Sequence, residues 1–167
     1  MNHLKLLLKR PLNKVSNWHV MAFFVIALIG FADAAFLTVE HYRGVIPPCT
    51  TAGCDLVLTS AYSALFGVPT SLLGALYYLA MALCAFIFLE ARHVSGIVKS
   101  HHFSILKWAK LGTVVGFLLS LWFTYIQVFI LHAYCLYCLG SALISILLFI
   151  IGLDALRKNY LQPFENI

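Results

Sequence analysis

Long apolar blocks divide the chain, and polar segments separate them. The blocks run over residues 18–39, 72–89, 111–131 and 134–153. A helix needs about 20 predominantly apolar residues to cross the hydrocarbon core of a bilayer. The pattern therefore predicts an all-α membrane protein, built as a bundle of four transmembrane helices.

A shorter segment of mixed apolar and hydroxylic residues lies between the first two blocks, in the connection of residues 40–71. Residues 55–66 are too few to cross a membrane. Gly67 and Pro69 are expected to end the segment, and Thr70 or Ser71 to cap the helix that follows. The segment is predicted to be an amphipathic half-helix that lies on the membrane surface or dips into it.

The composition supports a membrane protein. Of 167 residues, 62% are hydrophobic and 10% are charged, whereas a soluble domain is about half apolar and about a quarter charged. The length allows one small bundle in contact with lipid. We expect a tail of residues 1–17, a membrane domain of residues 18–153 and a second tail of residues 154–167.

The net charge of +5 predicts orientation rather than nucleic-acid binding, because the basic residues are spread over the connections between blocks. Only Arg43 lies in the connection after the first block. The other ten lie in the two tails and the second connection: Lys5, Lys9, Arg10, Lys14, Arg92, Lys99, Lys107, Lys110, Arg157 and Lys158. Positive loops stay in the cytoplasm. Both tails are therefore predicted to be cytoplasmic, in a bacterial inner membrane.

Four of the five cysteines form two close pairs, and this topology places both pairs at the outer, periplasmic face. Cys135 and Cys138 are three positions apart where the fourth block begins, so on a helix they share one face. A helix N-terminus stabilises a thiolate. Two alternatives are simple packing of small apolar side chains and a zinc site. No ligand-bearing soluble module surrounds the pair, so we expect no metal.

Cys49 and Cys54 follow two prolines in the outer connection, where a mobile pair could meet a soluble thiol and then the fixed inner pair. Thiol–disulfide exchange requires such direct contact between sulfur atoms. The alternative is a static disulfide that closes the loop. Cys84 lies toward the cytoplasmic end of the second block and is predicted to be a packing residue.

A relay of this kind needs a final electron acceptor, and a membrane quinone is the lipid-soluble candidate. Cys138 should lie roughly 6 Å below the outer end of its block, and Asp33 about 9 Å below the end of the first. Several other polar side chains fall at a similar depth: Tyr77, Tyr78, Tyr125 and Gln127. Asp33 could move protons or could simply bond a neighbouring hydroxyl. The tyrosines could instead belong to the aromatic belt of the membrane interface.

The order of these features resembles the vitamin K epoxide reductase family in its bacterial form. The resemblance covers about residues 18–153. The shared features, in chain order, are the loop pair Cys49 and Cys54, the run Cys54-Asp55-Leu56-Val57-Leu58-Thr59-Ser60, the run Phe66-Gly67-Val68-Pro69-Thr70-Ser71-Leu72-Leu73-Gly74, and Cys135-Leu136-Tyr137-Cys138 at the start of the last helix.

The resemblance implies a role for each position. Cys138 would face the quinone ring, Cys135 would exchange with Cys54, and Cys49 would receive electrons from a partner. Ser60 would cover or bond the quinone. Ala142 stands where animal members carry a tyrosine, so a quinone is expected as substrate rather than vitamin K epoxide. Many bacterial members carry a fused thioredoxin-like domain, and here we expect a separate thioredoxin-like protein instead.

Together these features predict a quinone-dependent thiol–disulfide oxidoreductase. Electrons would pass from a periplasmic, DsbA-like partner through the two cysteine pairs to ubiquinone or menaquinone, and disulfide bonds would form in the partner. The alternative is a non-enzymatic membrane scaffold or transporter subunit whose cysteines form structural disulfides. Relay disulfides should open and re-form under mild reductant, whereas structural ones should resist it.

Overall fold

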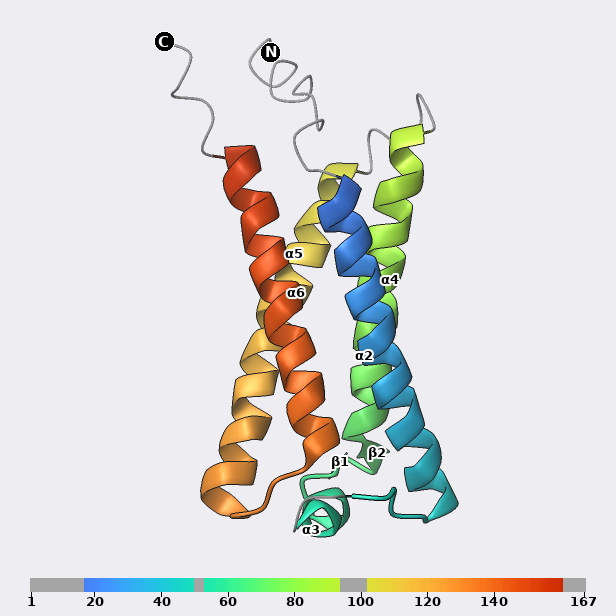
Figure 1. Ribbon diagram of the computed structural model, residues 1–167, viewed down its shortest axis with the longest axis vertical. Coiled ribbons are helices and arrows are strands. Elements are labelled where there is room, and N and C mark those ends of the chain that lie inside the picture. Colours follow the sequence, from blue (N-terminus) through green and yellow to red (C-terminus); the bar gives the residue numbers. More distant parts are fainter. Residues whose placement is uncertain (1–16, 50–52, 94–101, 161–167) are drawn as a thin grey trace.

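Four long helices run side by side in the computed structural model, which describes residues 17–49, 53–93 and 102–160 (Figure 1). The helices are α2 (Asn17–Arg43), α4 (Thr70–His93), α5 (His102–Tyr125), which continues into the π-helix η2 (Ile126–Ile130), and α6 (Leu136–Tyr160). Within the described residues these four are long and apolar enough to cross a membrane. The predicted all-α four-helix bundle is confirmed. The predicted tails lie largely outside the described residues.

Each helix extends beyond the apolar block that predicted it at one end at least. The first block ends at residue 39, but α2 continues to Arg43. It stops where Gly44 adopts a left-handed φ of 65°. The Gly44 N–H then donates to the His41 carbonyl, and the Val45 N–H donates to the Glu40 carbonyl. This is a Schellman cap, which satisfies the last carbonyl groups of a helix.

Small side chains hold the helices close together. The interior contains Ala27, Ala34, Ala75 and Ala82, which pack around the ring of Tyr78. Such residues let membrane helices approach each other closely. On α5, a Cβ at Gly116 would collide with the hydroxyl of Tyr77. Helices α4 and α5 therefore meet at a glycine.

The outer connection differs from the predicted half-helix of residues 55–66. Helix α3 (Cys54–Thr59) has six residues and is followed by an antiparallel hairpin of β1 (Ala64–Leu65) and β2 (Val68–Pro69). Phe66 and Gly67 form the turn with φ values of 52° and 80°. Two successive left-handed residues suit a tight hairpin turn, so this segment doubles back where a helix would have continued.

Two hydroxyl groups fix the ends of this segment. The Ser60 hydroxyl donates to the Val57 carbonyl at 2.8 Å, where α3 ends. The hydroxyl of Thr70, one of the two residues expected to cap α4, donates to the Ser63 carbonyl at 3.0 Å. Thr70 therefore ties the start of α4 to the loop that covers the bundle.

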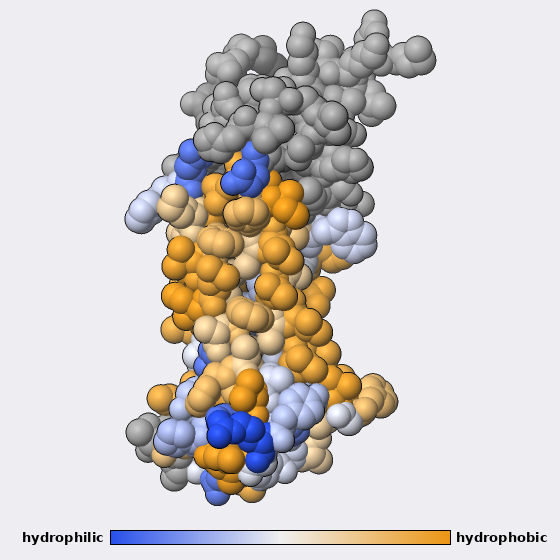
Figure 2. Space-filling view, turned by 90° about the vertical axis from the view of Figure 1, so that its right-hand side faces the viewer, coloured by the Kyte–Doolittle hydropathy of each residue, from blue (hydrophilic) through white to orange (hydrophobic). Residues whose placement is uncertain are grey.

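The two ends of the bundle differ in content. Helix α2 begins and α6 ends at one end, and the opposite end carries α3, the hairpin and the start of α6 (Figure 1). We call the latter the cysteine end. The visible face is hydrophobic over the length of the helices and more hydrophilic at the cysteine end (Figure 2). This distribution fits a bundle that spans a bilayer.

Candidate functional site

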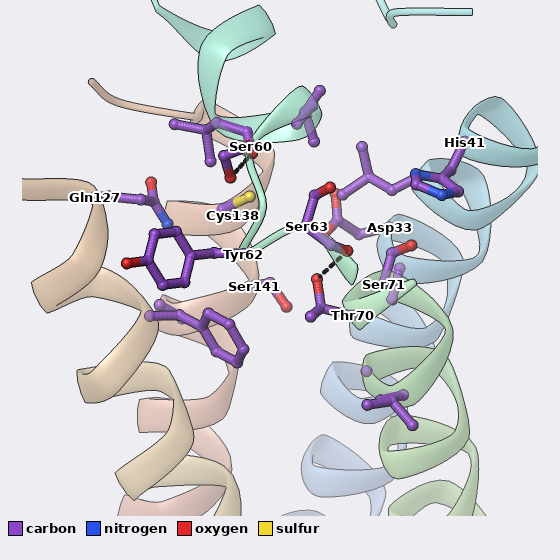
Figure 3. A pocket seen from close by; sticks show the side chains of 18 of the residues that line it. Asp33, His41, Ser60, Tyr62, Ser63, Thr70, Ser71, Gln127, Cys138 and Ser141 are labelled. Atoms are coloured by element: carbon purple, nitrogen blue, oxygen red, sulfur yellow. Dashed lines mark hydrogen bonds between the residues drawn. The ribbon is translucent and has the colours of Figure 1, made fainter. Parts of the chain in front are cut away.

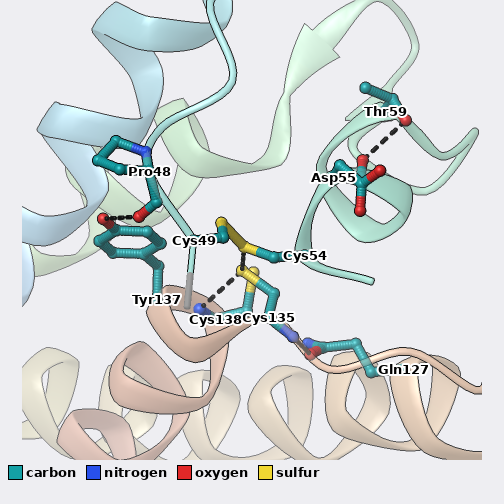
Figure 4. The surroundings of a disulfide bond; sticks show 9 residues. All are labelled: Pro48, Cys49, Cys54, Asp55, Thr59, Gln127, Cys135, Tyr137 and Cys138. Atoms are coloured by element: carbon teal, nitrogen blue, oxygen red, sulfur yellow. Dashed lines mark hydrogen bonds between the residues drawn. A yellow bond between two sulfur atoms is a disulfide. The ribbon is translucent and has the colours of Figure 1, made fainter. Parts of the chain in front are cut away.

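The two cysteine pairs meet at the cysteine end (Figure 4). Cys49 and Cys54 form a disulfide, with their Cα atoms 6.1 Å apart. Cys135 and Cys138 are free thiols. The sulfur atoms of Cys54 and Cys135 lie 3.7 Å apart, although 81 positions separate them in the chain. The structure thus brings together the four cysteines predicted from the sequence.

Gly53 makes this contact possible. Its φ of 90° lies in the left-handed region, which side chains disfavour. A Cβ at this position would come within 2.8 Å of the Cβ of Ala133. Cys54 follows Gly53 directly, and Ala133 lies two residues before Cys135. A glycine is therefore needed to press the loop pair against the start of α6.

Cys135 lies at the N-cap position of α6. Its carbonyl accepts the Leu139 N–H at 3.0 Å, and its sulfur accepts the Cys138 N–H at 3.4 Å. A side chain at an N-cap satisfies N–H groups that lack partners within the helix. The sulfur of Cys135 therefore takes the place that a serine or aspartate oxygen fills in other helices.

These donors change the acidity of Cys135. The thiol of Cys138 donates to the Cys135 sulfur and lowers the pKa of Cys135 to about 7, an effect that burial opposes. The backbone N–H groups of Tyr137 and Cys138 act in the same direction as the thiol. A thiolate, not a thiol, attacks a disulfide. Cys135 is therefore suited to exchange near neutral pH.

Gln127 and Tyr137 hold the inner pair and the loop in place. Gln127 is buried on η2, and its Oε1 accepts the backbone N–H of Cys135 at 3.2 Å. The Tyr137 hydroxyl donates to the Pro48 carbonyl at 3.0 Å, next to Cys49. Gln127 was predicted as a quinone residue, and the structure shows that it also positions Cys135. The sequence did not single out Tyr137 for this role.

A cavity of about 680 Å³ lies directly below the cysteines. It is lined by side chains from all four long helices, from α3 and from the hairpin. Figure 3 shows Cys138, Gln127 and Tyr62 on one side of this space and Asp33 on the other. The cavity therefore joins the inner cysteine to the apolar interior of the bundle.

Most of the predicted quinone residues line this cavity, and one does not. The residues that do are Asp33, Ser60, Tyr77, Tyr78 and Gln127. Tyr125 is absent from the lining. Its side chain is 49% exposed, and it stacks on Phe129 with ring centroids 5.0 Å apart. Successive helix residues are about 100° apart. Tyr125 lies two positions before Gln127, so it faces outward when Gln127 faces inward. The placement of Tyr125 in the site is corrected.

Polar atoms without partners mark the cavity wall. Within the described residues, the Oδ2 of Asp33 and the hydroxyl of Tyr77 are buried and lack a hydrogen-bond partner. The Tyr78 hydroxyl is satisfied instead, because Ser141 and Ser145 on α6 lie within 2.9 Å of it. A binding pocket is typically apolar with a few polar groups that fix the ligand. The wall therefore fits a quinone, which has an apolar ring and two acceptor oxygens.

Several cavity residues were not predicted. They are Tyr62 and Ser63 after α3, and Ser141, Ala142 and Ser145 on α6. Cys138, Ser141 and Ser145 follow the spacing of one helix face, which would have pointed to the two serines. Tyr62 lies in a loop, where no periodicity exists. Cys84 is a half-buried free thiol outside the cavity lining.

Comparison with known proteins adds one match. The family model described as the vitamin K epoxide reductase family matches residues 21–153. A search of curated proteins gives no match. The matched residues include all four cysteines of the site and the residues that line the cavity.

Proposed function

The chain belongs to the vitamin K epoxide reductase family, and from this premise we propose that it is a quinone-dependent oxidase of protein dithiols. The observation that carries the proposal is the 3.7 Å contact between the sulfur atoms of Cys54 and Cys135. Exchange proceeds by attack of one sulfur on another. This contact connects the loop pair to the cysteine that opens α6.

Electrons enter the protein at the loop pair. Cys49 is partly exposed and Cys54 is fully buried, so a partner thiolate reaches Cys49 first. The mixed disulfide is resolved by the second partner thiol, which leaves the partner oxidised and the loop pair reduced. We propose that this partner is a separate thioredoxin-like protein on the periplasmic side of a bacterial inner membrane.

Electrons then pass inward to the cavity. The Cys54 thiolate attacks the Cys135 sulfur of a Cys135–Cys138 disulfide, and Cys49 resolves the resulting Cys54–Cys135 bond. This leaves the inner pair as a dithiol, the state seen in the structure. A bound ubiquinone or menaquinone supplies the capacity to accept two electrons. Asp33 and Tyr77, whose Oδ2 and hydroxyl lack hydrogen-bond partners in the described residues, would hold it beside Cys138. Ser60 also lines this space, although its hydroxyl already donates to the Val57 carbonyl.

The direct test is anaerobic quinone reduction by the purified full-length protein with a dithiol donor. We expect quinol to form in proportion to the dithiol consumed. The Cys135→Ala variant should form none, whereas Cys84→Ala should match the unchanged protein. If the unchanged protein does not reduce quinone with the dithiol donor, the proposal is contradicted and structural disulfides are favoured.

A further inference from the structure

The reaction proposed above requires a proton that the inner cysteine pair does not carry. Reducing a quinone to a quinol takes two electrons and two protons. When Cys135 is a thiolate and Cys138 a thiol, forming their disulfide releases two electrons and only one proton. The pKa of Cys135 lies near 7 because the Cys138 thiol donates to it, so this form is populated at neutral pH. One proton must come from elsewhere.

Asp33 is placed to supply that proton. It lines the same cavity as Cys138, and its Oδ2 is buried there with no partner in the part of the chain that the structure describes. A buried carboxyl group with no structural hydrogen bond at that oxygen is an uncommon and costly arrangement. Ionisable residues inside a membrane bundle usually mark a functional pathway.

The route from Asp33 to the outside follows one face of α2. Leu37, Glu40, His41 and Gly44 line the cavity together with Asp33, and their spacing of three or four residues keeps them on one side of the helix. The Glu40 side chain is 12% exposed, and His41 is exposed. The stripe therefore leads from the buried Oδ2 of Asp33 to solvent over about 12 Å.

Hydroxyl groups from the covering segments lie between these points. Ser63, Thr70 and Ser71 line the cavity, and Figure 3 draws them between Cys138 and the α2 side, with His41 farther out. The cavity is mostly apolar, but along this side its polar groups lie together, and buried water typically bridges polar groups of this kind. Water and hydroxyl groups together can carry a proton along the stripe.

We propose that Asp33 donates a proton to a quinone oxygen in the cavity, and that it is reloaded from the cysteine end along Glu40 and His41. The inference rests on the proposed function. Other titratable or charged groups that face this region, from each packed element, are Arg43 of α2, Tyr62 of the covering loop, Tyr77 and Tyr78 of α4, Cys135 before α6 and Cys138 of α6. None of these groups is a carboxyl group, and Glu40, the other carboxyl group in the cavity lining, lies two helical turns nearer the end of α2 than Asp33.

The test compares Asp33→Asn with the unchanged full-length protein reconstituted in lipid. After reduction of the cysteines, quinone reduction should be about 100-fold slower in the variant, the usual loss when a general acid is removed. Exchange between the loop pair and the inner pair, measured without quinone, should change far less, because the charge of Asp33 is only a minor influence on the pKa of Cys135. Asp33→Glu should restore much of the rate. Asp154→Asn, at the far end of α6, serves as the control and should match the unchanged protein.

A second readout does not depend on turnover. Infrared difference spectra of quinone reduction should contain a carboxyl C=O band that shifts in D₂O and is missing in Asp33→Asn. The double variant Glu40→Gln/His41→Asn should slow steady-state turnover at least severalfold.

The outcomes separate this inference from the proposed function. If the unchanged protein reduces quinone and Asp33→Asn reduces it equally fast, the proposed role of Asp33 is wrong. The role is also wrong if the infrared spectrum of Asp33→Asn still contains the carboxyl band. If the double variant turns over at full rate, the route along α2 is wrong. If the unchanged protein never reduces quinone, the proposed function itself fails.

Discussion

Cys135 combines two tasks that usually fall to different residues. Its sulfur caps the first turn of α6 through the Cys138 N–H, and the same sulfur touches Cys54. A capping group that carries negative charge is favoured at a helix N-terminus. The helix N-terminus therefore stabilises the thiolate that exchange requires.

The pH dependence of the inner pair should reveal this effect. The pKa of Cys135 is lowered to about 7 from the ordinary value of 9.0, so its thiolate forms above about pH 7 and is lost below it. Thiolate absorbance of the reduced protein should therefore rise with a midpoint near 7. In Cys138→Ala the midpoint should move upward, because the donating thiol is gone. A midpoint unchanged by this substitution would contradict the assigned cause.

Cys138→Ala should also trap an intermediate of the relay. In protein whose Cys49–Cys54 disulfide is intact, the Cys135 thiolate should still attack Cys54 and release Cys49 as a thiolate, but no Cys138 remains to attack Cys135 and release Cys54. A Cys54–Cys135 disulfide should therefore accumulate, and quinone reduction should stop. Peptide mapping under non-reducing conditions measures this product. Cys84→Ala is the matched control, and the product should not form there.

Ala142 predicts the range of substrates. It lines the cavity one turn below Cys138 and offers no hydroxyl group. Animal members of the vitamin K epoxide reductase family carry a tyrosine at the matching position. We expect quinone turnover to exceed vitamin K epoxide turnover by at least tenfold when both are assayed with one dithiol donor. Equal rates would show that this position does not set the preference.

At the scale of elements, the proposed relay depends on the approach of α3 to α6. Gly53 precedes α3, and Ala133 precedes α6. Their backbones lie so close that a Cβ at Gly53 would meet Ala133. The contact is made by connecting segments and not by the long helices. The contact between the two cysteine pairs therefore depends on a few residues in the connecting loops.

Gly53→Ala should slow exchange between the pairs by up to about 100-fold, since small displacements at a reacting centre are costly. Gly67→Ala is the matched control. Its φ of 80° carries the same roughly 1–2 kcal/mol cost but has nothing within 4 Å. Adding Ala133→Gly to Gly53→Ala should relieve the collision and restore part of the rate. Single-turnover exchange kinetics would measure all three, and similar losses in both alanine variants would contradict the argument.

Hydropathy predicted the four spans because it measures how much of the chain matches lipid. It did not predict where each helix ends, because helical hydrogen bonding continues into polar residues, as it does to Arg43. It also missed the hairpin, which depends on left-handed Phe66 and Gly67. The depth of residues in the bundle was predicted well enough to find Asp33 and Gln127. Depth alone carries no information on direction, and Tyr125 was misplaced for that reason.

At the scale of the whole molecule, the cysteines lie at the end of the bundle opposite to the start of α2 and the end of α6. Figure 1 shows the two ends, with α3 and the hairpin marking the cysteine end. The lysine and arginine count predicts that the cysteine end faces away from the cytoplasm. The orientation and the chemistry then agree, because disulfides form in oxidising compartments.

Labelling tests that orientation. A membrane-impermeant thiol reagent added to intact cells after mild reduction should modify Cys49, which is partly exposed at the cysteine end. It should not modify Cys84, which lies on α4 about 21 Å from the start of that helix. Mass spectrometry of the labelled peptides measures both. If Cys49 is labelled only after the inner membrane is opened, the predicted orientation is wrong.

The confinement of the cysteines, the cavity and the α2 stripe to one end of the bundle has an energetic consequence. Moving one elementary charge across a bilayer costs or yields about 2.3 kcal/mol per 100 mV of membrane potential. On the proposed route, electrons and protons enter from the same side and travel inward together to the same quinone, so no net charge crosses. The proposed reaction is electroneutral. Its driving force is then set by the redox couples alone, and it runs equally well in an energised and a depolarised membrane.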